Sequence, residues 1–432
     1  MREMKDSGIE WIGEIPQNWS ISPLFCYFTE GRNPNVGLKN DNLLSLSYGN
    51  IIRKDINTKD GLLPANFESY NIVRKHHIIV RTLDLQNDKK SLRTGLVKEE
   101  SGIITSAYLN LVPKQYIYSP YYYYLLHVYD LIKVFYNMGN GVRQSLNFKE
   151  FSKLPLISPT DYEQKKIADY LDSKCSQIDL IIEKQKQIIE KLKEYKTSLI
   201  TEVVTKGLDP NVEMKDSGVE WIGKIPKHWC YLAFRNVLFE RTEKNDPICT
   251  NERLSLSIDK GVTLYAEKTT NLDRFKDDVS QYKLAYEGDL VLNSMNMIVG
   301  AVGVSNYFGC VSPAYYTYYD NKADHITSRY CDYLFRCKTM RKVLFSLGKG
   351  IMSIDRGDDR INTCRLKVSR TDLRALKIPV PPEAEQRKIV NFLNQKEITI
   401  NKTISDRQIA IEKLQEYKKS LIYEVVTGKR EV

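Results

Sequence analysis

The sequence predicts a mixed α/β (α+β) protein with two similar globular domains separated by two long, paired antiparallel helices. Three observations support this prediction. The phrase MKDSGIEWIGEIPQNW at residues 4–19 returns as MKDSGVEWIGKIPKHW at residues 214–229. A long segment of helical periodicity follows each phrase, at residues 163–205 and 385–427. Between these repeated ends lie Val-, Ile- and Leu-rich stretches broken by glycine, a pattern typical of strands.

The repeat divides the chain into four predicted regions. A repeat of this length is a whole domain rather than one turn of a solenoid. The end segments of the two copies are nearly identical in sequence, whereas the middle segments share only a common pattern of residue types. We therefore expect the end segments to have the same function in both copies and the middle segments to have different functions. The predicted regions are a first globular domain at 1–155, a first long-helix region at 156–213, a second globular domain at 214–380 and a second long-helix region at 381–432.

The two long segments are predicted helices with a heptad seam, because apolar residues recur in alternating steps of four and three. Thr160 and Glu163 form a predicted capping box at the start of the first helix. Polar seam residues at Lys174, Gln185, Lys396 and Arg407 weaken the seam but can define its register. The predicted pairing seam contains Ile167, Leu171, Ile178, Ile181, Ile188, Leu192, Tyr195 and Leu199 in the first helix, and Ile389, Leu393, Ile400, Leu414, Tyr417 and Leu421 in the second.

The tyrosine run at residues 121–124 allows two interpretations. Tyrosines can stack on nucleic-acid bases. However, the spacing of Tyr121, Tyr124, Val128, Ile132 and Phe135 is that of a helix face. The spacing therefore favours a helix that faces the core.

The composition bounds the class of protein. The chain has 432 residues, with 42% apolar and 27% charged residues, as expected of a globular protein. No apolar run is long enough to span a bilayer. The eight cysteines form no CxxC pair, which favours reduced thiols in a cytoplasmic protein. The formal charge of +10 is weak evidence for an anionic partner.

The sequence lacks recognisable catalytic motifs, which predicts a protein that is not an enzyme. No GxxxxGK[ST] phosphate-binding loop is present. The Pro-Pro pair at 381–382 does not match the motif with which adenine methyltransferases hold a flipped base. The segment at 161–165 is a poor match to a metal-dependent nuclease. Two alternatives remain, namely an enzyme (nuclease or methyltransferase) of unrecognised type and a coiled-coil scaffold that binds no nucleic acid.

The order of these segments resembles the specificity (S) subunit of type I restriction–modification enzymes over essentially the whole chain. The segments that carry the resemblance are SGVEWIGKIPKHW, GDLVLNSMNMIVGAVGV and LKIPVPPEAEQRKI. The resemblance implies that the globular domains are two target-recognition domains, each reading half of a bipartite site in double-stranded DNA. It also implies docking of two methyltransferase (M) subunits and of restriction (R) motor–nuclease subunits. This chain then needs no cofactor, and S-adenosylmethionine, ATP and Mg belong to the partner subunits.

Candidate DNA contacts are polar and basic residues in predicted loops, since Arg, Lys, Asn, Gln and Ser read base edges or bind phosphates. The second copy carries about thirteen extra residues between Gly350 and Arg370, and this Arg-rich insertion has no counterpart in the first copy. The candidates are Tyr48, Asn50, Arg81, Lys89, Lys90, Arg93, Arg143 and Gln144 in the first domain, and Asn293, Ser294, Asn296, Lys349, Arg356, Arg360 and Arg365 in the second.

Overall fold

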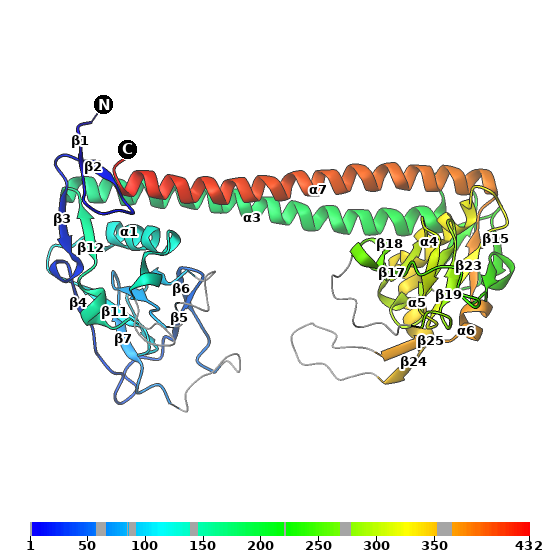
Figure 1. The fold of residues 1–432 in the computed structure, drawn as a ribbon, viewed down its shortest axis with the longest axis horizontal. Coiled ribbons are helices and arrows are strands. Elements are labelled where there is room, and N and C mark those ends of the chain that lie inside the picture. The colour runs from blue at the N-terminus through cyan, green and yellow to red at the C-terminus, as the bar shows by residue number, and fades with distance from the viewer. Residues whose placement is uncertain are drawn as a thin grey trace. The chain divides into compact units, whose positions relative to one another are not determined.

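The computed structural model describes residues 2–57, 66–83, 85, 92–138, 146–219, 222–267, 278–351 and 365–432. The chain forms two compact units (Figure 1). Unit 1 contains Met1–Lys186 and Gln408–Val432, and unit 2 contains Gln187–Arg407. Each unit therefore combines one globular domain with parts of both long helices, α3 (Asp161–Lys206) and α7 (Glu383–Val426).

Unit 1 is built around a four-stranded antiparallel sheet in the order β4-β11-β8-β9. Two-stranded pairs β1–β2, β3–β12, β5–β6 and β7–β10 complete it. Its strands are β1 (Met4–Asp6), β2 (Glu14–Pro16), β3 (Ser20–Pro23), β4 (Phe28–Glu30), β5 (Leu44–Ser47), β6 (Asn50–Arg53), β7 (Asn71–Arg74), β8 (Ile78–Val80), β9 (Thr94–Leu96), β10 (Ser101–Ile104), β11 (Leu109–Pro113) and β12 (Pro155–Ser158), and its short helices are η1 (Leu24–Cys26), α1 (Ser119–Leu131), η2 (Val134–Asn137) and α2 (Phe148–Phe151).

Unit 2 repeats this design around the sheet β16-β23-β20-β21. The pair β24–β25 flanks the Arg-rich insertion. Its strands are β13 (Met214–Asp216), β14 (Lys224–Pro226), β15 (Cys230–Ala233), β16 (Phe239–Arg241), β17 (Leu254–Ser257), β18 (Gly261–Leu264), β19 (Lys283–Ala285), β20 (Leu290–Asn293), β21 (Val302–Val304), β22 (Gly309–Val311), β23 (Tyr315–Tyr319), β24 (Gly348–Ile351), β25 (Arg365–Val368) and β26 (Lys377–Val380), and its short helices are η3 (Phe234–Asn236), η4 (Tyr265–Glu267), η5 (Met297–Val299), α4 (Ile326–Arg336), α5 (Lys338–Leu347) and α6 (Arg370–Ala375).

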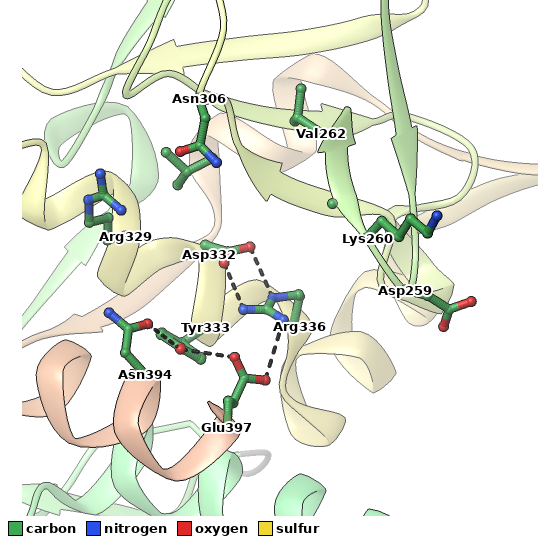
Figure 2. Close-up of a pocket in the computed structure, with 12 residues that line it drawn as sticks. Asp259, Lys260, Val262, Asn306, Arg329, Asp332, Tyr333, Arg336, Asn394 and Glu397 are labelled. Atoms are coloured by element: carbon green, nitrogen blue, oxygen red, sulfur yellow. Dashed lines mark hydrogen bonds and ion pairs between the residues drawn. The ribbon is translucent and has the colours of Figure 1, made fainter. Parts of the chain in front are cut away.

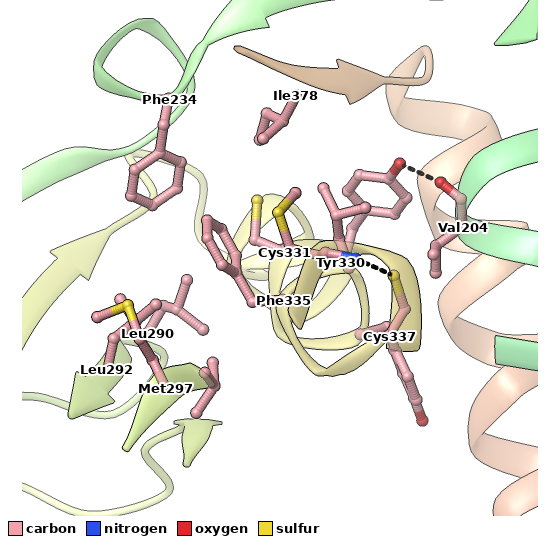
Figure 3. Packing of buried hydrophobic residues seen from close by; sticks show 14 of the residues in the cluster. Val204, Phe234, Leu290, Leu292, Met297, Tyr330, Cys331, Phe335, Cys337 and Ile378 are labelled. Atoms are coloured by element: carbon pink, nitrogen blue, oxygen red, sulfur yellow. Dashed lines mark hydrogen bonds between the residues drawn. The ribbon is translucent and has the colours of Figure 1, made fainter. Parts of the chain in front are cut away.

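The core of unit 2 surrounds α4, and Figure 3 shows its packing. Tyr330, Cys331 and Phe335 of α4 lie among side chains from the sheet, from β26 and from the end of α3. In unit 1 the corresponding helix is α1, whose Tyr121, Tyr122 and Tyr129 are fully buried. The prediction that the tyrosine run faces the core is therefore confirmed.

The capping box at the start of α3 is also confirmed. The Glu163 backbone N–H donates to Thr160 Oγ1 at 3.4 Å, and the Thr160 N–H donates to the Glu163 carboxylate at 3.3 Å. These bonds satisfy backbone donors that the first helical turn leaves without partners.

Seven of the fourteen predicted seam residues are buried, namely Ile167, Leu171, Ile178, Ile389, Leu393, Ile400 and Leu421. Next to Ile181, Ile188 and Leu199, the buried residue is the following one in the chain. Ile181, Tyr195 and Tyr417 are 44%, 52% and 49% exposed, so their assignment to the seam was wrong. Ile188, Leu192, Leu199 and Leu414 are only partly buried. The buried stripe instead contains Ile167, Leu171, Cys175, Ile178, Ile182, Ile189, Ile200 and Val203 on α3, and Ile389, Leu393, Ile400, Ile411, Leu421, Ile422 and Val425 on α7.

The physical reason for the shift is that adjacent isoleucines made two stripes equally apolar. Residues 181 and 182 are both Ile, and so are 188 and 189. A step of one residue rotates the side chain by about 100° around the helix. The sequence pattern alone cannot decide between two such stripes, whereas the packing in the folded chain selects the second.

Candidate nucleic-acid interface

The repeated opening phrase packs against the C-terminal end of a long helix in each unit. In unit 2, a Cβ added to Gly207 would lie 3.3 Å from the Trp229 ring, just after the end of α3. In unit 1, a Cβ added to Gly428 would lie 2.5 Å from Pro16 and 3.0 Å from Trp19, just after the end of α7. Both glycines have a left-handed φ, near +80° and +75°. The opening phrase therefore occurs twice in the sequence because each unit has one helix end for it to cover.

Equivalent hydrogen bonds connect the globular domain and the helices in the two units. In unit 1, Tyr121 Oη lies 3.3 Å from the Ile157 carbonyl oxygen and 3.1 Å from that of Val426, either of which can accept its proton. In unit 2, Tyr330 Oη lies 3.1 Å from the Pro379 carbonyl oxygen and 2.9 Å from that of Val204. These residues occupy matching places in the two sequence copies. The scaffold that positions the candidate interface is therefore the same in both units.

A polar cavity of about 250 Å³ lies in unit 2 beside this scaffold (Figure 2). Arg336 forms a bidentate ion pair with Asp332, with distances of 3.0 and 2.7 Å. Glu397 accepts from Tyr333 Oη at 3.0 Å and pairs with Lys196 at 3.0 Å. Burial raises the pKa of Asp332, and the neighbouring Arg336 opposes that rise. Because the acids face bases, this cluster joins α4 to the long helices and presents no activated nucleophile.

The matching place in unit 1 replaces three charged residues with neutral ones but keeps a carboxylate, since Tyr124 Oη donates to Asp172 at 2.7 Å. There Tyr123, His127 and Cys175 stand where unit 2 has Asp332, Arg336 and Glu397. Burial, with smaller effects from Lys418 and Lys419, lowers the pKa of His127 to about 4. The two globular domains therefore join their helices through different chemistry, although the backbone design is shared.

Three predicted DNA contacts are buried, so the structure corrects them. Arg93 is fully buried, and its guanidinium donates to the Leu83 carbonyl oxygen at 2.7 Å. Asn293 accepts backbone N–H groups from Met295 and Asn296, at 3.1 and 3.3 Å. Ser294 is fully buried in the same turn. Arg93 and Asn293 form hydrogen bonds with the backbone around them, and Ser294 is buried next to Asn293, so none of the three side chains faces solvent.

Four predicted contacts are exposed, namely Tyr48, Asn50, Asn296 and Lys349. Lys349 Nζ pairs with Asp372 at 3.0 Å. Arg81 is partly buried at the end of β8. Lys89, Lys90, Arg143, Gln144, Arg356 and Arg360 lie outside the described residues, as does the side chain of Arg365, whose backbone belongs to β25.

Sequence reasoning missed the tip of the β17–β18 hairpin. Ile258, Asp259 and Lys260 are exposed there, at the place where unit 1 has Tyr48 and Gly49. The signal was present in the alignment of LSLSYG at 44–49 with LSLSID at 254–259, in which an identical strand ends in different residues. We therefore add this tip to the candidate interface.

Among the described residues, no group of three or more His, Cys, Asp or Glu side chains is placed to hold a metal ion. Within the same residues, no helix has the length and apolar character that crossing a membrane requires.

Comparison with known proteins gives consistent matches. Residues 64–200 match the family model for the type I restriction modification DNA specificity domain. The putative type I restriction enzyme MjaX specificity subunit of Methanocaldococcus jannaschii is 23% identical over 97% of this chain and 95% of its own length.

Solved structures share the fold. A chain from a structural study of the assembly and conformational transition of a type I restriction–modification system aligns with a TM-score of 0.64 and 13% identity, over 96% of this chain and 99% of that one. The HsdS subunit of Thermoanaerobacter tengcongensis aligns with a TM-score of 0.51 and 14% identity, over 98% of this chain and all of its own. Together with the repeated two-unit fold, these matches show that the chain contains a match to the type I restriction modification DNA specificity domain at residues 64–200 and is similar over nearly its whole length to a type I restriction enzyme specificity subunit.

Proposed function

We propose that this chain reads a bipartite, asymmetric DNA site, with one half-site for the globular domain of each unit. The observation that carries the proposal is a shared scaffold with different exposed tips. The β5–β6 and β17–β18 hairpins have the identical strand Leu-Ser-Leu-Ser and then diverge to Tyr-Gly-Asn and Ile-Asp-Lys. Since base contacts carry sequence information and scaffold contacts do not, different tips support different half-sites.

Docking of two methyltransferase subunits is the second part of the proposal, with restriction subunits joining the full complex. Exposed residues that are identical in both copies are not explained by the fold and support a shared partner. Tyr195 and Tyr417 are the most apolar of them. The others on the same stretch are Glu190, Lys191, Glu194 and Ser198, which match Glu412, Lys413, Glu416 and Ser420. Two copies of one surface can bind two copies of the same partner, one at each surface.

This role places the protein in the cytoplasm with the DNA that it reads. The observations give less support to an enzyme of unrecognised type, because the acids of the polar cluster in unit 2 are paired with Arg336 and Lys196. A scaffold without nucleic acid would not need two diverged tips on one framework. Neither alternative is favoured by a specific feature of either unit.

The test of the DNA-reading role is to express the full chain with the methyltransferase subunit of its own system in a host free of adenine methylation. Single-molecule sequencing then maps modified adenines across the genome. We expect a motif in two unlike parts separated by a gap, with one modified adenine in each part, on opposite strands. A continuous or palindromic motif would contradict the proposal.

The docking surface is tested by the double variant Tyr195→Ala, Tyr417→Ala. It should lose the copurifying methyltransferase, because aromatic anchors carry much of an interface's binding energy. Tyr162→Ala is the matched control, since Tyr162 is an exposed tyrosine on α3 whose counterpart in the second copy is Ala384. Equal loss in both variants would show that the repeated tyrosines have no special role.

A further inference from the structure

The β5–β6 hairpin packs closely on the sheet of unit 1. Its residues Leu46 and Ile51 pack over Gly95 of β9, where an added Cβ would lie 2.7 and 2.8 Å from their side chains. In unit 2, Gly303 of β21 gives the same room, since an added Cβ would lie 3.0 Å from the backbone of Gly261. Glycine is required at both places because the hairpin approaches the sheet closely.

The tip of the hairpin in unit 1 is supported from the helix side as well. Tyr123 Oη of α1 donates to the Gly49 carbonyl oxygen at 3.1 Å. A Cβ on Gly49 would meet Leu92 at 3.1 Å and His127 at 3.6 Å. The backbone at the tip is therefore packed from below, while the neighbouring side chain is free to face solvent.

That neighbouring side chain is Tyr48, which combines exposure with backbone strain. Its φ is +47° and its side chain is 82% exposed. The left-handed conformation costs roughly 1–2 kcal/mol for a residue other than glycine. Turns of this kind usually place Asn, Asp or Gly at this position. A large aromatic residue held there gains little packing in return, which points to a ligand as the reason for its presence.

A second tyrosine shows that exposure and strain do not suffice by themselves. Tyr116 has a φ of +66° and is 85% exposed, but its counterpart in unit 2, His325, is left-handed too, with a φ of +50°. The fold itself thus demands that conformation in the turn before α1 and α4. In the sequence alignment Tyr48 corresponds to Ile258, but the hairpin of unit 2 has a tip one residue longer, and its positive φ falls on Gly261. The strain at Tyr48 is specific to unit 1.

We propose that Tyr48 stacks against a base of the half-site read by unit 1, with Asn50 beside it contacting an adjacent base edge. This inference rests on the proposed DNA-reading function and assigns the residues that read one half. An aromatic ring can stack on any base, and an asparagine amide matches the edge of adenine. Asn50 is exposed at the start of β6, and its amide lies 3.5 Å from the Tyr48 carbonyl oxygen, so both groups belong to one small surface.

The test compares Tyr48→Gly with Tyr116→Gly in the full chain, coexpressed with its methyltransferase subunit. Glycine relieves the left-handed strain at either position, so both variants should melt at or above the temperature of the unmodified protein. Tyr48→Gly should bind a duplex carrying the mapped motif about 5- to 150-fold more weakly, as expected for loss of one stacked base. Its methylation motif should become degenerate in one half only. Tyr116→Gly should keep both motif halves, and Tyr48→Phe should bind within about threefold of the unmodified protein because it keeps the ring.

The outcomes distinguish a failure of this inference from a failure of the proposed DNA-reading function on which it rests. If the unmodified protein and its partner give no DNA motif, the proposed function fails. If they give a bipartite motif that Tyr48→Gly leaves unchanged in sequence and affinity, only the role of Tyr48 fails. Loss of the copurifying methyltransferase in Tyr48→Gly would likewise overturn the inference, because Tyr48 would then be a protein anchor.

Discussion

Replacing Gly428 with alanine should detach the opening phrase of unit 1 from the end of α7. The added Cβ would lie 2.5 Å from two atoms of the Pro16 ring and 3.0 Å from Trp19 Cη2. A proline ring cannot swing aside as a flexible chain end does, so the phrase must shift. Overpacking of this kind costs about 1–3 kcal/mol. The left-handed φ of +75° adds roughly 1–2 kcal/mol for any residue other than glycine.

Gly8→Ala is the matched control for this prediction. Gly8 lies in the same opening phrase and has a φ of +64°, but an added Cβ would meet nothing within 4 Å. The control therefore carries the backbone strain without the steric clash, and the two variants should differ by the overpacking cost alone. For a unit of this size, each kcal/mol corresponds to about 2–4 °C in melting temperature. We expect Gly428→Ala to melt about 2–12 °C below Gly8→Ala.

The assay is thermal unfolding combined with hydrogen exchange of the opening phrase. Amide protons at the Pro16–Trp19 turn should exchange faster in Gly428→Ala than in the control, because the helix end no longer covers them. Equal melting temperatures and equal exchange in the two variants would refute the docking of the phrase on the helix end.

Three further predictions follow from the contacts in each unit. The pKa of His127 is lowered to about 4 in the folded chain, below its value of about 6.5 in the unfolded chain. The free energy of unfolding of unit 1 should therefore be highest above about pH 6.5 and should fall by about 3 kcal/mol as the pH falls toward 4. His127→Gln should weaken this pH dependence, as measured by melting curves at several pH values. Arg336→Leu should destabilise unit 2 by about 2–4 kcal/mol, measured by denaturant unfolding, because it leaves Asp332 buried without its ion pair, and a wild-type midpoint would contradict the role of the pair. A fragment of residues 1–213 should dimerise, since the end of α3 around Val204 can replace the end of α7 against a second copy, and only monomer in analytical ultracentrifugation would oppose this.

The long helices and the repeat could be predicted because their signals are local. Heptad periodicity and a capping box lie within a few residues of each other, so the sequence shows them directly. The choice of stripe could not be predicted, because it depends on which of two neighbouring isoleucines meets the opposing helix. Ile182 and Ile189 are buried, whereas Ile181 is largely exposed.

The candidate site could be predicted only in part, because burial of polar residues depends on distant partners. In the sequence, Arg93 resembled an exposed basic residue. In the structure its backbone N–H donates to Asp130 of α1, and its guanidinium donates to carbonyl oxygens near β8. Asn293 resembled a base reader, but it uses its amide oxygen to close its own turn. Tyr48 and Asn50 stay predictions, and the structure places them at the exposed tip of a short hairpin, where the strand pattern of the sequence ends.

The docking of each opening phrase on a helix end also affects the order in which the chain can fold. In unit 2, the phrase follows the end of α3 directly, so the two surfaces find each other with a short loop to close. In unit 1, the same kind of contact joins residues near 16 to residues near 428, almost the whole length of the chain apart. A ribosome delivers the N-terminal segment first, and that segment must wait for Gln408–Val432 before its last surface is covered. Unit 1 is begun first and completed last, which makes its closure a late, slow step and leaves its opening phrase uncovered while unit 2 is being synthesised.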